Sequence, residues 1–98
     1  MEQRKARRFD LKLPFELVRS GSAPLSEHSE TKNLSSAGVL FQSEAELHIG
    51  EPVEYVITLP TSPGGAGELV RLHCIGKVVR FARKTEIAAT LERYEFVR

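Results

Sequence analysis

The chain has 98 residues, of which 41% are hydrophobic and 28% charged, and its formal net charge is +1. This length fits one domain with its own core and excludes an enzyme that carries a separate cofactor domain. A single cysteine excludes an internal disulfide, no apolar run approaches the ~18 residues of a membrane span, and no apolar signal core is visible. We therefore expect a soluble protein of a reducing compartment, most simply the cytoplasm.

The small net charge hides an uneven distribution along the chain. Residues 1–8 hold four basic side chains against one acidic one, and residues 71–84 hold five basic side chains and no acidic one. A general nucleic-acid binder is usually basic overall, with a domain pI above ~9, whereas the pI of this chain is about 7.9. Two basic clusters on a neutral body favour a compact anionic ligand over DNA or RNA.

The first predicted strand covers residues 9–18, where five apolar side chains alternate with mostly polar ones. Because Pro14 has no N–H for a strand ladder, it predicts an edge position or a bulge. Residues 20–30 are rich in Ser, Gly and Pro and are expected to form a loop. A turn at residues 36–38 and a short strand at residues 39–41 follow.

Residues 45–49 fit either one helical turn or a loop. A second alternating pattern covers residues 53–59 and ends at Pro60, and the glycine-rich residues 62–67 predict a hairpin loop. The inward pattern resumes at Val70 and changes parity before Val79 and Phe81, which predicts a bulge at Gly76.

A final strand is expected over residues 86–94. Six or so short strands separated by turns predict an all-β fold, either an antiparallel barrel or a sandwich.

The residues that could support catalysis do not form a recognisable constellation. His28, His48 and His73 lie in unrelated contexts, and there is no G-x-S-x-G turn, phosphate-binding loop or metal-ligand spacing. His73 adjoins Cys74, but neighbouring strand residues point to opposite faces, so the two cannot pair. We expect His73 to be structural, Cys74 to be a buried hydrophobic residue, and the protein to be no enzyme, with no metal and no cofactor.

Two short motifs remain. Arg4 and Arg8 form an Arg-x-x-x-Arg motif, which this composition produces by chance roughly 0.8 times. Asn33, Ser35 and Gly38 form an Asn-x-Ser-x-x-Gly motif, which is expected roughly 0.01 times. The second motif therefore carries nearly all of the statistical weight.

These two motifs in this order, followed by residues 76–80 and 87–92, resemble the PilZ domain family over essentially the whole chain. The family commonly shows Asn in place of Asp at the first position of the second motif. The resemblance implies one domain over residues 1–98, with a flexible arginine arm at 1–8 and a small six-stranded antiparallel barrel at 9–94. It also implies a bacterial receptor for cyclic di-GMP, a binding module without catalysis.

The resemblance implies that cyclic di-GMP is clamped between the arm and the Asn33–Gly38 segment. The guanidinium groups of Arg4 and Arg8 can meet a phosphate or the O6/N7 edge of guanine with two hydrogen bonds each. Asn33 and Ser35 can hydrogen-bond a guanine, and Gly38 lets the backbone turn and approach without a Cβ. Secondary candidates for ligand contacts are Lys5, Arg7 and Arg80.

The arm has few apolar groups, and its basic side chains repel one another, so we expect it to become ordered only when the ligand binds. We also expect a downstream protein of unknown identity to detect its position. One alternative is an interaction adaptor of the same fold that binds no nucleotide, in which residues 1–8 are a solvated tail and residues 33–38 only a turn. A small nucleic-acid-binding barrel is a further alternative, but it needs stacking aromatics. The available aromatics are expected mostly in the core: Phe41, Tyr55, Phe81, Tyr94 and Phe96.

Overall fold

The computed structural model describes residues 10–60 and 69–97, which form seven strands. The strands are β1 (Pro14–Ser20), β2 (Ala23–Leu34), β3 (Gly38–Gln42), β4 (Pro52–Pro60), β5 (Leu69–Arg83), β6 (Glu86–Thr90) and β7 (Arg93–Val97). The described residues contain no helix, and so none that could span a membrane. The prediction of an all-β fold is confirmed.

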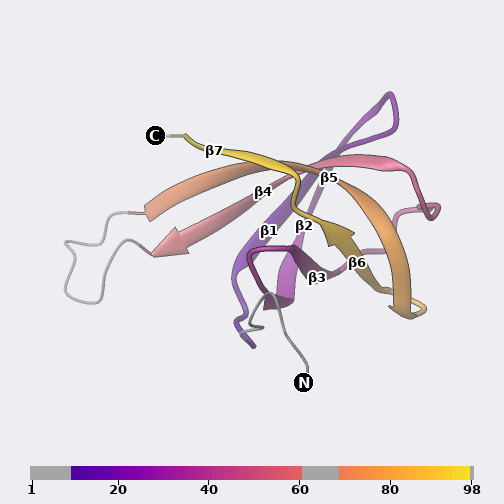
Figure 1. The fold of residues 1–98 in the computed structure, drawn as a ribbon, viewed down its shortest axis with the longest axis horizontal. Coiled ribbons are helices and arrows are strands. Elements are labelled where there is room, and N and C mark those ends of the chain that lie inside the picture. Colours follow the sequence, from indigo (N-terminus) through magenta and orange to yellow (C-terminus); the bar gives the residue numbers. More distant parts are fainter. Residues whose placement is uncertain (1–9, 61–68, 98) are drawn as a thin grey trace, which may run out of the picture.

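Six of the strands close into an antiparallel barrel in the order β4-β1-β2-β3-β6-β5, because β5 pairs back onto β4. The consecutive strands β3 and β4 are not neighbours: β3 pairs with β6, and β4 pairs with β1. The loop of residues 43–51 therefore crosses from one half of the barrel to the other. The predicted six-stranded barrel is confirmed, and β7 is an additional strand along β5 (Figure 1).

The long strand β5 belongs to two parts of the sheet. Its residues 69–77 pair with β4, and its residues 78–83 pair with β6. Strand β7 continues the line of β6 along β5, where it pairs with residues 71–75. The predicted single strand over residues 86–94 is thus two strands, separated at Leu91 and Glu92.

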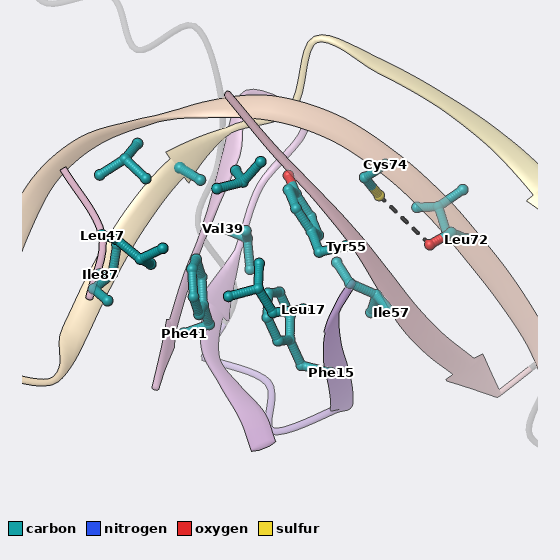
Figure 2. Close-up of a cluster of buried hydrophobic side chains, with 13 residues drawn as sticks. Phe15, Leu17, Val39, Phe41, Leu47, Tyr55, Ile57, Leu72, Cys74 and Ile87 are labelled. Atoms are coloured by element: carbon teal, nitrogen blue, oxygen red, sulfur yellow. Dashed lines mark hydrogen bonds between the residues drawn. The ribbon is translucent and has the colours of Figure 1, made fainter. Parts of the chain in front are cut away.

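The core is built around three stacked aromatic rings (Figure 2). Phe15 lies 4.3 Å from Phe41 and 5.2 Å from Tyr55, measured between ring centroids. The Tyr55 hydroxyl donates a hydrogen bond of 2.9 Å to the Thr90 carbonyl, and burial raises the pKa of this hydroxyl well above its usual range. The other buried apolar residues are Leu17, Val39, Leu47, Val53, Ile57, Leu72, Cys74, Val78, Ile87 and Ala89.

Cys74 and His73 point to opposite sides of β5, as expected. Cys74 is fully buried, and burial raises the pKa of its thiol to about 12, so the thiol is unreactive at neutral pH. His73 lies on the outer side, with its Nε2 atom 2.5 Å from a carboxylate oxygen of Glu54. The histidine thus has the Glu54 carboxylate as a structural partner.

The prediction of a loop over residues 20–30 is wrong. Only Gly21 and Ser22 form the turn, with Gly21 at φ +61°, and β2 starts at Ala23 and pairs with β1. This part of β2 is polar because one face is exposed and the other is only half-buried. Its backbone hydrogen bonds to β1 make the strand, and local composition cannot show them.

Two further predictions need correction. Strand β1 starts at Pro14 rather than at residue 9, and residues 10–13 precede it without regular structure. Phe81, Tyr94 and Phe96 lie outside the core, with exposed fractions of 40%, 59% and 62%. The reason is positional: Phe81 lies near the end of β5, beyond the part that pairs with β4, and the other two lie on the additional strand. Residues 45–49 form a loop that buries Leu47.

Candidate functional site

A pocket of about 150 Å³ lies on the outer surface over β2, β3, β6 and β5. Asn33, Ser35 and Gly38 of the second motif line it from one side, and Arg80 of β5 lines it from the other. The structure thus brings together four residues that sequence analysis selected from two distant segments.

The strand register explains how these residues meet. Asn33 of β2 pairs with Leu40 of β3, Leu40 pairs with Ala88 of β6, and Ala88 pairs with Arg80 of β5. Directly paired residues carry their side chains on the same face of a sheet. One row across four strands therefore consists of Asn33, Leu40, Ala88 and Arg80. Asn33 and Arg80 lie three strand spacings, or about 14 Å, apart. Because the Ala88 side chain is small, it leaves space above β6 in this row.

A bulge in β2 turns Asn33 toward this row. Thr31 is fully buried and pairs with Phe41, so regular alternation would also direct residue 33 inward. The register shifts between Thr31 and Asn33, which leaves Lys32 as the extra residue and moves Asn33 to the outer face.

A second bulge, in β5, directs Arg80 to the outer face. Buried Val78 pairs with Ala89, and the register shifts before Arg80, which leaves Val79 as the extra residue. The predicted change of parity in this strand is real, but its predicted place at Gly76 is wrong. Gly76 pairs regularly with Val53, and it is glycine because a Cβ there would collide with the Thr90 carbonyl.

The Ser35–Gly38 segment is a tight turn fixed by its own serine. The Ser35 hydroxyl accepts hydrogen bonds from the backbone N–H groups of Ala37 (3.1 Å) and Gly38 (3.3 Å), and the Ser35 N–H donates to the Gly38 carbonyl (2.9 Å). Gly38 does not have a positive φ. A Cβ at this position would lie 2.5 Å from the Ala89 carbonyl oxygen, so glycine is required by close approach to β6 and not by the turn.

The polar groups at the two ends of the pocket have no partners among residues 10–60 and 69–97. Within these ranges the Asn33 amide makes no side-chain hydrogen bond, and Arg80 makes no ion pair. The other cations near this face are different: Lys32 and Arg83 both contact Glu86, at 3.3 Å and 3.7 Å. An amide and a guanidinium are therefore available to a ligand that lies across the row.

Thr31 ties the segment before β1 to the strand that carries Asn33. Its hydroxyl donates to the Leu11 carbonyl (2.5 Å) and accepts from the Leu13 N–H (2.9 Å), and its own N–H donates to the Leu13 carbonyl (3.0 Å). The chain therefore leaves β1 toward its N-terminus from a point two residues away from Asn33 on β2. Sequence analysis missed this role, because a threonine between polar residues carries no signal of burial.

The arginine motif and its neighbours cannot be placed in this site. Arg4, Lys5, Arg7 and Arg8 lie outside the described residues. A metal centre has no candidate in the described ranges, where no three His, Cys, Asp or Glu side chains gather.

Comparison with known proteins gives one match. The family model of the PilZ domain matches residues 2–97. No curated protein and no solved structure gives a match. The matched range includes both motifs and all seven strands.

Proposed function

Because the chain belongs to the PilZ domain family, a family of cyclic di-GMP receptors, we propose that it binds cyclic di-GMP. It acts as a binding module and not as an enzyme. The ligand lies across the row from Asn33 to Arg80 and is covered by the arm that carries Arg4 and Arg8. The observation that carries this proposal is the row itself, because two bulges direct an amide and a guanidinium into one pocket whose other lining residues carry no charge.

The ligand's chemistry matches these groups. Cyclic di-GMP has two phosphodiester charges and two guanines, each with O6 and N7 acceptors. The Asn33 amide offers both a donor and an acceptor to a guanine, and the Arg80 guanidinium offers paired N–H donors to a phosphate or to O6/N7. The Ser35 hydroxyl primarily holds the turn, and its contribution to the ligand is to keep Asn33 and Gly38 in place.

The size of the pocket explains why an arm is needed. Ligand sites usually enclose ~300–1,000 Å³, and this pocket of about 150 Å³ can provide only one wall. The Thr31 contacts fix Leu11 next to the strand of Asn33. Three residues span at most ~11 Å, so the proposal requires Arg8 to contact the ligand within that distance of this anchor. The arm then supplies the second wall and two more guanidinium groups.

In this proposal the position of the arm is the signal. Ligand binding orders the arm over the barrel, and a downstream protein partner detects the change, while the barrel strands stay in place. The protein would act in the cytoplasm. We expect it to bind neither DNA nor RNA, since its pI of about 7.9 is low for a general nucleic-acid binder.

Calorimetric titration tests the ligand. We expect micromolar or tighter binding of cyclic di-GMP, no binding of oligonucleotides, and at least tenfold weaker binding in Asn33→Ala and in Arg80→Ala, since a good bidentate contact contributes about 1–3 kcal/mol. Arg71→Ala is the matched control, because Arg71 is also exposed on β5 but lies in its β4-paired part, away from the pocket. A wild-type protein that binds no cyclic di-GMP would instead be an adaptor. Equal losses in Arg71→Ala and Arg80→Ala would contradict the proposed site.

Thr31→Val is expected to weaken ligand binding roughly tenfold, although Thr31 does not touch the pocket. Valine keeps the shape but removes the hydroxyl that holds Leu11 and Leu13, and re-ordering even one backbone residue costs ~1–2 kcal/mol. Hydrogen exchange should show less ligand-induced protection at residues 4–8 than in the wild type.

The conservative variant Thr31→Ser keeps the hydroxyl and should recover most of the affinity. If Thr31→Val loses stability but binds as tightly as the wild type, Thr31 supports only the fold and does not position the arm.

A further inference from the structure

Strand β7 is an open edge of the sheet. In the part of the chain that the structure describes, it pairs only with β5, and all five of its residues are exposed (Figure 1). Its second edge therefore presents backbone N–H and C=O groups that no described strand satisfies. Such an edge is a template for another strand.

One face of β7 carries aromatic side chains of the kind found in cores. Tyr94 pairs with Cys74 and Phe96 pairs with Leu72, so the two rings lie on the same sheet face as these buried residues. Their exposed fractions are nevertheless 59% and 62%, and the rings contact each other edge to face at 6.3 Å. An apolar strip thus extends the inner face of the sheet beyond the barrel and is left uncovered by the described residues.

The charged side chains on the opposite face of β7 indicate which strand can pair with this edge. Arg93 and Glu95 lie on that face, one on either side of Tyr94 in sequence. If a second copy of β7 pairs antiparallel with the register centred on Tyr94, Arg93 of each copy faces Glu95 of the other. A register centred on Glu95 would instead place the two carboxylates opposite each other. The strand is therefore complementary to itself in one register.

We propose that two copies of this chain associate through β7, antiparallel and centred on Tyr94, so that one continuous sheet crosses a twofold axis. The pairing satisfies the open backbone edge at residues 93–95, places Tyr94 against Tyr94 of the second copy, and forms two Arg93–Glu95 pairs. With only three facing residues of β7 per copy, the interface is small and the association weak and concentration-dependent. The proposed ligand pocket lies over the β6-paired half of β5, whereas β7 pairs with residues 71–75 of the other half.

Sedimentation velocity over a range of about 10 to 500 μM tests the proposal. We expect the wild type to shift from monomer toward dimer as concentration rises. Arg93→Glu and Glu95→Arg should each weaken self-association at least tenfold, because each places like charges opposite each other. The double swap R93E/E95R should restore dimerisation. An equimolar mixture of the two single variants should form a heterodimer, since all facing charges are then opposite.

All four proteins should give the same thermal unfolding midpoint within a few degrees, because both residues are exposed on the surface. A wild type that stays monomeric over the whole range would overturn the proposal. A dimer that forms equally well in both single variants, or that the double swap does not restore, would exclude β7 in this register. These results are independent of ligand binding, because no nucleotide is present.

Discussion

Replacing Gly76 with alanine is expected to lower the free energy of unfolding by about 3 kcal/mol or more, the largest loss we expect for a single methyl group in this chain. The added Cβ would lie 2.7 Å from the Thr90 carbonyl carbon and closer still to its oxygen. Both are backbone atoms, and the carbonyl accepts a hydrogen bond from the buried Tyr55 hydroxyl. The carbonyl cannot retreat without breaking that bond, so β5 and β6 must separate.

Chemical denaturation of three glycine variants measures this effect. Gly50 has open space around its missing Cβ but a φ of +89°, so Gly50→Ala should cost only about 1–2 kcal/mol. Gly38→Ala, which meets the Ala89 carbonyl, should fall between the two. Equal losses at positions 50 and 76 would show that backbone conformation, and not the approach of β5 to Thr90, determines the need for glycine.

The second large effect is expected in the arm. Arg8→Ala and Arg4→Ala should each weaken cyclic di-GMP binding about a hundredfold, and Arg→Lys at either position at least tenfold. Lysine keeps the charge but cannot make the paired, planar hydrogen bonds of a guanidinium. Calorimetric titration of the four variants separates geometry from charge.

Arg83→Lys is the control for this series. Arg83 is exposed and already contacts Glu86, so its replacement should leave affinity within twofold of the wild type. If Arg4→Lys and Arg8→Lys also bind like the wild type, the first eight residues act as a diffuse basic tail, and the proposed clamp is wrong.

The core of the barrel could be predicted where one face of a strand differs strongly from the other. Phe15 and Leu17 in β1, and Val53, Tyr55 and Ile57 in β4, alternate with polar or smaller residues and are buried as expected. Strand β2 could not be predicted, because its first half has no strongly apolar face and is held by pairing with β1. Tyr94 and Phe96 have a core-like pattern, but the sheet continues past the barrel at that point.

Four of the residues that line the pocket could be selected from the sequence, but their geometry could not. The rare motif identified Asn33, Ser35 and Gly38, and the basic cluster suggested Arg80. Their alignment depends on bulges at Lys32 and Val79, and a bulge is set by the register of the partner strand. Neither residue differs from an ordinary strand residue in sequence, so the row across four strands emerges only from the pairing.

The strand order has a consequence for how the protein unfolds. It divides the barrel strands into two halves, β1-β2-β3 and β4-β5-β6, which pair with each other at β1–β4 and at β3–β6 and are joined by the loop of residues 43–51. The aromatic stack draws Phe15 and Phe41 from one half and Tyr55 from the other. Neither half alone can shield its apolar face from water. Unfolding of one half therefore exposes the apolar face of the other. Loss of either the β1–β4 or the β3–β6 pairing should therefore unfold the whole barrel in a single cooperative step.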